Sequence, residues 1–303
     1  MNRKEIQEYV LNQKEPFTVD QLSEITGIGI TSIQRTVNSL IKDGYTFNRV
    51  DNYYIRSKVK IGGVIFDASR FLDKRYLRFG VVSDTHLSSI HERTDELHSV
   101  YDIFQKEGVK VVIHAGDVTD GWGVYRGQEF EIKHIGQQAQ IDHAISVYPI
   151  REGMQTFFIT GNHDLRQYER GGIDIGKTLA SQRSDMTYLG QIYARVKIQE
   201  TSMDILHPDG RTAYALSYKA QRLINNLQPK MVPDMMVWGH YHTSFYMHYR
   251  GIEFLQAPCF KDAGLWEKRL GMNPTIGAWM VDAVLSDDTQ FINSFQPHLF
   301  HFE

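Results

Sequence analysis

Residues 77–86 read Leu-Arg-Phe-Gly-Val-Val-Ser-Asp-Thr-His, a mostly apolar run that leads directly into an aspartate and a histidine. A short apolar run of this kind is typical of a buried β-strand. Sheets flanked by helices build their sites at the carboxyl ends of the strands, and carboxylate and imidazole groups are common metal ligands. The segment therefore predicts a strand that delivers Asp84 and His86 to a polar site.

The same pattern recurs along the chain. Four further apolar runs end in polar residues: 109–113 before Asp117, 157–160 before Asn162, 203–206 before His207, and 235–238 before His240 and His242. A helical stripe, Leu97, Val100, Tyr101 and Phe104, lies between the first two strands. The alternation predicts an α/β fold.

Later segments complete the predicted architecture. The residues around Arg250-Gly251 predict a hairpin over 245–249 and 252–255, and 277–284 predicts another strand. The spacing of Leu216, Ala220 and Leu223 predicts a helix over 213–227. We expect two mixed β-sheets packed face to face with helices outside.

The donor set has a clear chemical bias. Its carboxylate, amide and imidazole groups include no thiolate, which suits manganese, iron or zinc rather than a structural zinc site. Seven ligands are too many for one tetrahedral ion, but they suit two ions about 3.5–4 Å apart that share a carboxylate. In an extended segment, Asp84 and His86 would lie on one face, and the same would hold for His240 and His242.

The order Asp-x-His, Gly-Asp, Gly-Asn-His-Asp, a single His and Gly-His-x-His resembles the five sequence blocks of the calcineurin-like metallophosphoesterase superfamily. The resemblance covers residues 75–285 and implies two divalent ions, manganese first, with iron, zinc and nickel as alternatives. It implies a metal-bridging hydroxide as the nucleophile. It also implies the ligands: Asp84, His86 and His242 for one ion, Asn162, His207 and His240 for the other, and Asp117 as the bridge.

The resemblance assigns His163 a role without metal ligation. This histidine would protonate the leaving oxygen and stabilise its charge, and either Asp120 or Asp164 would orient it. His114, three residues before the bridging aspartate, is a candidate to support the ligands from behind. We expect the seven remaining histidines to lie outside the site.

The first sixty residues follow a different pattern. They hold nine Lys or Arg and seven Asp or Glu, a charge of +2, which leaves −5 for the remainder because the total is −3. Thr18 with Gln21 and Thr31 with Gln34 predict capping boxes at two helices, with Ile25 inside the first of them. An earlier helix and strands at 45–50 and 53–56 complete the pattern of a winged helix-turn-helix. We predict this domain over residues 1–60, a linker over 61–75 and the metallophosphoesterase domain over 76–303.

DNA is the partner expected for the first domain. Its third helix would expose short polar and basic side chains to a major groove, and the DNA-binding candidates are Arg35, Asn38 and Lys42, with Ser32, Thr36 and Ser39 beside them. A protein-interaction or dimerisation module is the alternative, which leaves a homo-oligomer open.

Composition excludes several classes of protein. The chain has 303 residues, 42% of them hydrophobic, and a single cysteine, Cys259, so an intramolecular disulfide is excluded. No apolar run approaches the roughly 20 residues that span a bilayer. A net charge of −3 argues against a basic nucleic-acid coat protein. We expect a soluble, cytoplasmic protein with no membrane partner.

The departures from the family pattern bear on the substrate. Protein serine/threonine phosphatases of the superfamily carry an arginine soon after Gly-Asp, and residues 116–121 have none, which argues against a phosphoprotein substrate. The insertion 122–148 offers either a wall that receives a nucleic-acid strand or a helix pair that covers the sheet; its candidate contacts are Tyr125, Arg126, Gln128, Lys133 and His134.

Together, these features predict a nuclease that hydrolyses DNA phosphodiester bonds with two metal ions. A phosphodiesterase for cyclic or small nucleotides is one alternative. A DNA-binding regulator with a metal-sensing domain is another, although the complete ligand set argues against it.

Overall fold

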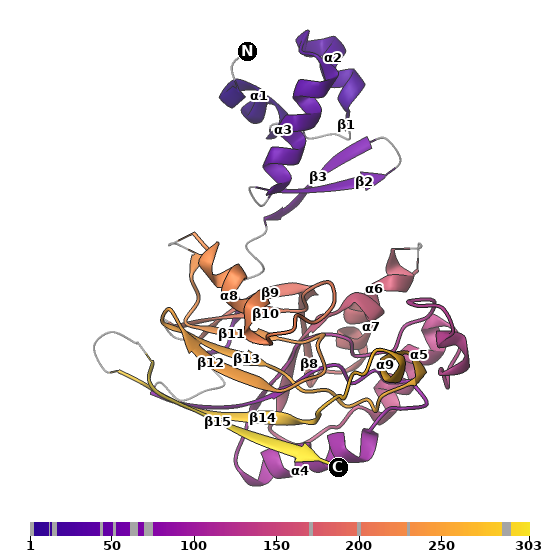
Figure 1. Cartoon of the computed structure of the whole chain (residues 1–303), viewed down its shortest axis with the longest axis vertical. Helices are drawn as coiled ribbons and strands as arrows, with labels where there is room; N and C mark the ends of the chain where they lie inside the picture. Colours follow the sequence, from indigo (N-terminus) through magenta and orange to yellow (C-terminus); the bar gives the residue numbers. More distant parts are fainter. Residues whose placement is uncertain are drawn as a thin grey trace. The chain divides into compact units, whose positions relative to one another are not determined.

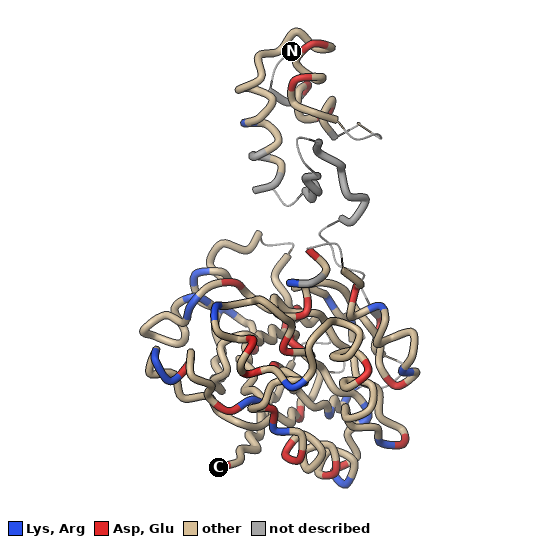
Figure 2. Tube along the Cα trace, turned by 90° about the vertical axis from the view of Figure 1, so that its right-hand side faces the viewer, with Lys and Arg blue, Asp and Glu red and all other residues tan. Residues whose placement is uncertain are grey.

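The structure is a computed structural model that describes residues 3–11, 13, 17–42, 45–50, 53–60, 66–69, 75–169, 172–198, 201–228, 231–286 and 292–303. The backbone forms two compact units, Met1–Gly63 and Val64–Glu303 (Figure 1). Within the second unit, basic and acidic residues are interspersed along the trace (Figure 2). Any site for a charged ligand must therefore be built locally.

The first unit holds three helices and a small antiparallel sheet. The helices are α1 (Arg3–Leu11), α2 (Val19–Thr26) and α3 (Ile30–Lys42), and the strands β1 (Phe17–Thr18), β2 (Tyr45–Val50) and β3 (Tyr53–Lys60) pair in the order β1-β3-β2. Apolar side chains of all three helices form the core of this unit, and Val10, Leu22 and Val37 are buried in it. These are the elements predicted for the winged helix.

The start of α2 is the best-defined local signal in this unit. Thr18 Oγ1 accepts from Gln21 N (3.1 Å), and Gln21 Oε1 accepts from Thr18 N (2.8 Å), so the predicted capping box is confirmed. The second predicted box is wrong, because α3 already begins at Ile30 and Thr31 lies inside the helix. Ile25, predicted to be inside, is 70% exposed.

The second unit consists of two six-stranded sheets. The strands of the first are β5 (Tyr76–Val82), β6 (Val111–His114), β7 (Gln155–Thr160), β8 (Met186–Gln191), β14 (Ile276–Leu285) and β15 (Ile292–Phe302), in the order β15-β14-β5-β6-β7-β8. Those of the second are β4 (Phe66–Asp67), β9 (Tyr193–Ile198), β10 (Thr201–Leu206), β11 (Met235–Trp238), β12 (Phe245–Tyr249) and β13 (Ile252–Gln256), in the order β12-β13-β11-β10-β9-β4. Parallel and antiparallel pairs occur in both sheets, so the predicted fold class, α/β with two mixed sheets, is confirmed.

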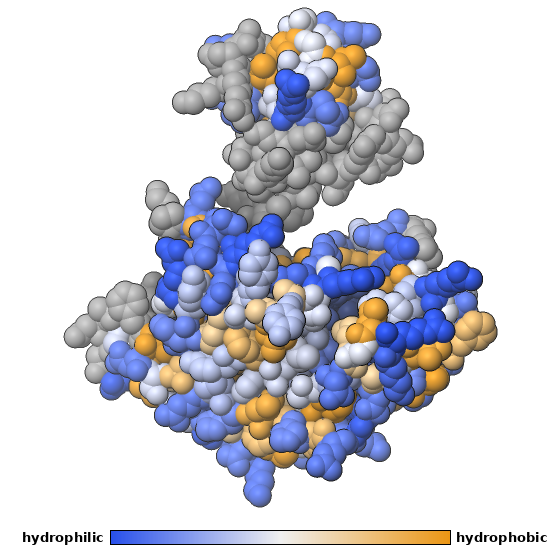
Figure 3. All heavy atoms as spheres, viewed as in Figure 1, coloured by the Kyte–Doolittle hydropathy of each residue, from blue (hydrophilic) through white to orange (hydrophobic). Residues whose placement is uncertain are grey.

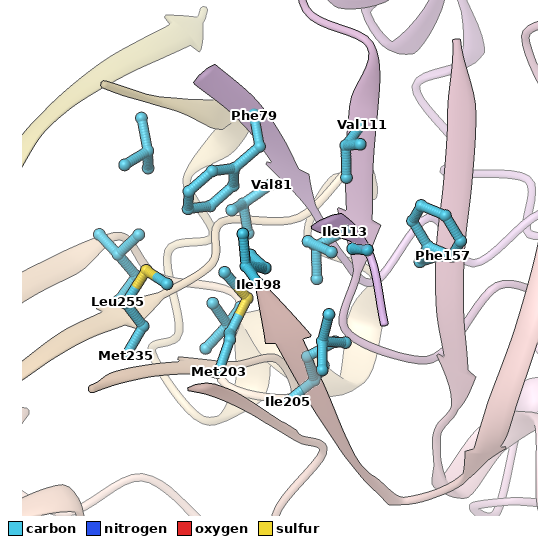
Figure 4. Close-up of a cluster of buried hydrophobic side chains, with 14 of the residues drawn as sticks. Phe79, Val81, Val111, Ile113, Phe157, Ile198, Met203, Ile205, Met235 and Leu255 are labelled. Carbon is cyan, nitrogen blue, oxygen red and sulfur yellow. The ribbon is translucent and has the colours of Figure 1, made fainter. Parts of the chain in front are cut away.

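One hydrophobic core lies between the sheets. Alternate residues of β5 face it, and Leu77, Phe79 and Val81 are fully buried. Residues of the other sheet, among them Met203 and Ile205, pack against them (Figure 4). The strand alternation therefore places one side of each sheet in this core and leaves the other side for helices.

Helices cover the outer faces. α4 (Thr94–Lys106), α5 (Gln137–Val147) and α7 (Ile175–Gln182) bury apolar side chains against the first sheet. α8 (Ser217–Asn225) packs on the second sheet through Ala220 and Ile224. The helix predicted over 213–227 is thus shorter at both ends, and Leu216, assigned to its apolar face, is 42% exposed. Two short helices, α6 (Asn162–Tyr168) and α9 (Leu265–Arg269), lie in the loops near the strand ends.

Several elements were not predicted. β8, β9 and β15 are additional strands, and Phe66–Asp67, expected in the linker, pairs with Val196 and Lys197 of β9. Exposed hydrophobic residues form separate patches on the face shown in Figure 3. Among the described residues, no helix is long and apolar enough to cross a membrane.

Candidate metal centre and active site

The predicted ligands follow five strands that end at one edge of the two sheets. β5, β6 and β7 are parallel neighbours in the first sheet, and β10 and β11 are parallel neighbours in the second. Parallel strands end on the same side, so the loops after them meet there. Those loops carry Asp84, His86, Asp117, Asn162, His207, His240 and His242.

The backbone of these loops is not extended, which corrects the expected geometry. Asp84, His86 and Asp117 have φ values of 50°, 43° and 55°, and His240 and His242 have values of 78° and 53°. Non-glycine residues in the left-handed region cost roughly 1–3 kcal/mol each and occur where surrounding structure enforces them. The tight backbone turns the side chains of successive motif residues into the same small volume.

The predicted ligand atoms form two groups, and a third group, made of His86, Asp117 and His163, connects them. In the first, His86 Nε2 lies 3.0 Å from His242 Nε2, and His242 Nε2 lies 3.2 Å from Asp84 Oδ1. In the second, His207 Nε2 lies 3.0 Å from Asp117 Oδ2 and 3.1 Å from Asn162 Oδ1. The potential ligand atoms of Asp84, His86 and His242, and those of Asp117, His207 and His240, each lie within 4.8 Å of one another. These groups are compatible with the partition that the resemblance implies, and metal ligation by these residues stays a prediction.

The hydrogen bonds of three histidines determine which ring nitrogen faces the cluster. His86 Nδ1 donates to Asp120 Oδ1 (3.0 Å), and His207 Nδ1 donates to the carbonyl of Ala115 (2.8 Å), so Nε2 is the ring nitrogen that faces the cluster in both. His240 Nε2 donates to the carbonyl of Gly210 (2.9 Å), which leaves Nδ1 as its ligand atom. Metal-binding histidines are held in this way by carboxylates and carbonyls. The residues therefore fit two divalent ions.

The charges of the cluster also favour cations. Burial alone would raise the pKa of the Asp117 carboxyl, but the neighbouring histidines, His207 first among them, hold it below its ordinary value. Burial alone would lower the pKa of His207, whereas Asp117 and then Asp84 raise it to about 9. Buried carboxylates that hold a proton on an imidazole would also stabilise a metal cation at this position.

Two glycines of the motifs are required by close contact with ligands. A Cβ atom on Gly161 would lie 2.2 Å from Asp117 Oδ1. A Cβ atom on Gly116 would lie 2.5 Å from His207 Nδ1, and its φ of 99° disfavours other residues.

The two aspartates proposed to orient His163 have different roles. His163 Nδ1 donates to the backbone carbonyl of Asp120 (2.6 Å), and the Asp120 carboxylate lies 3.7 Å away. Asp164 instead accepts hydrogen bonds from the N–H groups of Val118, Thr119 and Gly161 and from the Thr119 hydroxyl, at 2.8 to 3.0 Å. These contacts favour Asp120 as the residue that orients His163. Asp164 instead joins the loop that carries Asp117 to the loop that carries Asn162.

His163 itself lies closer to the ligands than expected. Its ring nitrogen is within 4.8 Å of ligand atoms of His86 and Asp117. Burial lowers the pKa of His163 to about 4, against the opposite effect of Asp117. His114 is fully buried behind the ligands, where its ring nitrogens contact Thr85 Oγ1 and Gly116 N (3.2 Å each), as expected for a supporting residue.

A buried ion pair below the cluster was not predicted. Lys261 Nζ lies 3.0 Å from Glu267 Oε1 and 3.7 Å from Asp120 Oδ1. The ammonium thus balances the carboxylate that holds His86, and both lysine and glutamate are almost fully buried. Lys261 lies outside all five sequence blocks, so no motif could identify it.

A cavity of about 460 Å³ opens beside the ligands. The rings of Tyr125 and Trp266 stack along its wall, with centroids 5.7 Å apart. Tyr125 belongs to the insertion that was expected to contact a strand. Gln128 does not serve this role, because it is buried and donates to the Asp120 carbonyl (2.7 Å). Trp266, Arg211 and Leu270 also line the cavity and lie outside the motifs. The run 265–269, which contains an aromatic and two basic residues, is the signal that could have indicated Trp266.

The structure describes only part of the predicted DNA-binding surface. Arg35 is exposed on α3. The side chains of Asn38 and Lys42 lie outside the described residues. Thr36, expected to be exposed beside them, is buried, and its hydroxyl donates to the carbonyl of Ser32 (2.9 Å).

Comparison with known proteins extends these observations. A family model described as the calcineurin-like phosphoesterase superfamily domain matches residues 77–258. DNA polymerase II small subunits are similar in sequence: that of Thermoplasma acidophilum is 22% identical over 64% of this chain and 47% of its own length, and that of Archaeoglobus fulgidus is 25% identical over 56% and 41%. The chain thus spans less than half the length of these curated relatives. An archaeal phosphodiesterase structure covers 74% of this chain and 100% of its own, with 15% identity and a TM-score of 0.42.

Proposed function

The chain belongs to the calcineurin-like phosphoesterase superfamily, and we propose that it is a nuclease that hydrolyses DNA phosphodiester bonds. Membership of this superfamily supports the predicted enzyme class, a metal-dependent phosphoric ester hydrolase. The observation behind this proposal is the convergence of seven predicted ligand side chains from five strand ends, where two candidate metal sites are linked through His86 and Asp117. Such a pair of sites suits phosphoryl displacement.

The roles of the residues follow from their positions. Asp84, His86 and His242 would hold one divalent ion, Asn162, His207 and His240 the other, and Asp117 both. When bound, such ions supply Lewis acidity toward phosphate oxygens and lower the pKa of water. Manganese is the proposed metal.

The chain's own groups position the reaction. Asp120 fixes the ring of His86 through its carboxylate and that of His163 through its carbonyl. His163 lines the cavity next to Asp117 and Asn162, where a scissile phosphate would lie. We assign it the contact with the leaving oxygen. Because its Nδ1–H is bonded to the Asp120 carbonyl and its pKa is lowered to about 4, it would donate a proton or stabilise the charge in its protonated form, whose share rises toward acid pH.

DNA as the substrate is supported by two observations. The Tyr125–Trp266 stack lies next to the ligands, and aromatic walls receive nucleobases irrespective of their sequence. The curated relatives are named as subunits of a DNA polymerase. The three helices and hairpin of the first unit support a winged helix that contacts DNA through Arg35, Asn38 and Lys42.

The test compares substrates and one ligand variant. With Mn²⁺, the full chain should cleave single-stranded or duplex DNA, and Asp117→Asn should lower the rate at least about 100-fold, since even residues behind metal ligands cost 10–100-fold. Lys110→Ala, at an exposed position before the amino end of β6, is the control. Full activity of a folded Asp117→Asn protein would exclude this mechanism.

A phosphodiesterase for cyclic or small nucleotides is the second candidate. The cavity of about 460 Å³ is large enough for a mononucleotide. Faster hydrolysis of a cyclic nucleotide than of either DNA substrate would favour this function over the nuclease.

A further inference from the structure

A second cavity, of about 530 Å³, adjoins the one at the metal-binding cluster. Tyr241, which stands between two predicted ligands in the sequence, lines both. The cavity is also lined by Pro208 and Asp209, by Trp238 at the end of β11, and by side chains of α8 and of the residues after it. None of the sequence motifs extends into α8.

The indole ring of Trp238 forms part of the wall of this cavity. Trp238 is 2% exposed, and its indole N–H has no hydrogen-bond acceptor among the described residues. The ring is held in place by Phe254, whose ring meets it edge-on at 5.1 Å between centroids. The indole nitrogen has almost no accessible surface, so a ligand in the cavity would meet other atoms of the ring, and the N–H serves as a reporter of binding beside it.

Two cations flank the same cavity. Lys219 Nζ contacts the hydroxyl of Tyr241 (3.1 Å) and lies 5.0 Å from the centroid of its ring. Arg222, one turn further along α8, is exposed. Neither has a carboxylate partner within the described part of the chain, and Asp209 is the acidic residue in the lining. The walls therefore carry a net positive charge beside apolar groups of Leu223 and Leu227.

We propose that this cavity is a phosphate-binding subsite for a nucleotide. Lys219 and Arg222 would supply the positive charge that pairs with the phosphate oxygens. Leu223 and Leu227 would contact the sugar or base. The phosphate belongs either to a strand that continues over Tyr241 from the metal-binding cluster, which rests on the proposed nuclease function, or to a free nucleotide.

The experiment follows the Trp238 N–H directly. Indole N–H resonances of the ¹⁵N-labelled full chain are recorded with Mg²⁺ present, and Trp238→Phe identifies the relevant one among the four tryptophans. The probes are inorganic phosphate, thymidine monophosphate and an oligothymidylate. We expect this resonance to shift on binding, because Trp238 lines the cavity. Movement with the oligonucleotide alone assigns the phosphate to a strand, and movement with the monophosphate assigns it to a free nucleotide.

A charge variant provides the second measurement. Arg222→Glu should weaken binding of the probe that shifts the resonance by about tenfold or more, since a charge-assisted contact is replaced by repulsion. Lys110→Glu makes the same charge change at a distant exposed position and should leave the titration unchanged. A resonance that stays in place with all three probes, or an Arg222→Glu titration like that of the unaltered chain, overturns the subsite.

The outcome is separable from the proposed function. If DNA is cleaved while the resonance is stationary and Arg222→Glu leaves KM unchanged, the subsite is wrong and the nuclease stands. If the resonance responds in an Arg222-dependent way and no DNA is cleaved, the subsite stands and the nuclease is wrong.

Discussion

Asp120 is the residue on which the positions of two active-site histidines depend. Its carboxylate accepts from His86, its carbonyl accepts from His163, and Lys261 lies 3.7 Å from it. In Asp120→Asn, the shape is kept but the charge opposite His86 and Lys261 is lost. We expect metal affinity and rate to fall about 10–100-fold, as for other residues that hold a metal ligand.

Calorimetric titration with Mn²⁺ and steady-state hydrolysis of an aryl phosphodiester check this prediction. Asp102→Asn is the matched control, because that carboxylate is exposed and pairs with Arg151 away from the site. Unchanged metal affinity in Asp120→Asn would contradict the role given to the His86 contact.

Gly161 offers a test of the packing around Asp117. In Gly161→Ala, the new methyl group would meet Asp117 Oδ1 at 2.2 Å, so the carboxylate must move from its position between the two ligand groups. We expect loss of bound metal, measured by elemental analysis of the purified protein, together with loss of hydrolysis. Gly29→Ala, where the added carbon meets nothing within 4 Å, should retain both.

At the residue scale, the sequence predicted which side chains come together better than it predicted their geometry. The resemblance grouped Asp84 with His242, 158 positions apart, and the structure places their potential ligand atoms within 4.8 Å of each other. The assumption of an extended Asp-x-His segment failed because left-handed turns follow the strands. The roles of Asp120 and Asp164 depend on which backbone groups face each carboxylate, and spacing along the chain does not encode this.

At the scale of elements, the pair Arg78–Asp282 joins β5 to β14. These residues are Cα partners in the ladder, and Arg78 Nε and Nη2 contact the carboxylate at 2.6 and 2.8 Å. The hydrogen bonds from Arg78 lower the pKa of Asp282, against burial, and Tyr76 and His298 add to the effect. We expect Asp282→Asn to destabilise the second unit by about 1 kcal/mol at pH 7, since the pair is only partly buried.

The pH dependence has a definite sign. A carboxyl whose pKa is lower in the folded state stabilises the protein above its unfolded pKa of about 3.9, and this contribution is lost as the pH falls through the folded value. The difference in unfolding free energy between the original chain and Asp282→Asn should therefore be full above about pH 5 and shrink below about pH 4. Urea denaturation at these pH values measures it. A difference that grows toward acid pH would contradict the assignment.

Elements were predictable from the sequence where a single local pattern, such as an apolar run or a capping box, determines them. β11 is a continuous apolar run, β5 and β7 each contain a short apolar run, and Thr18 with Gln21 indicated the start of α2. β15 was missed because Pro297 interrupts its pattern, and an edge strand tolerates proline since one side of its backbone needs no partner. The start of α8 was missed because Leu216 continues the helical spacing into a loop.

At the scale of the whole molecule, two units divide the proposed work between DNA contact and hydrolysis. The second unit holds the complete ligand set and its own core between two sheets, so removal of residues 1–63 should leave hydrolysis of a small aryl phosphodiester within about twofold of the full chain. DNA affinity, measured by fluorescence anisotropy at fixed salt, should fall at the same time.

A point variant in the intact chain tests the DNA contact while the fold of the first unit is kept. Arg35 is exposed on α3, so Arg35→Glu should preserve the fold of the first unit while it replaces attraction to phosphate by repulsion. We expect DNA binding to weaken about tenfold or more and to depend less steeply on salt, because one phosphate contact fewer releases fewer counterions. Lys110→Glu, with the same change of charge on the second unit, is the control. Equal DNA affinity of the Arg35→Glu protein and this control would assign the first unit to protein contacts instead.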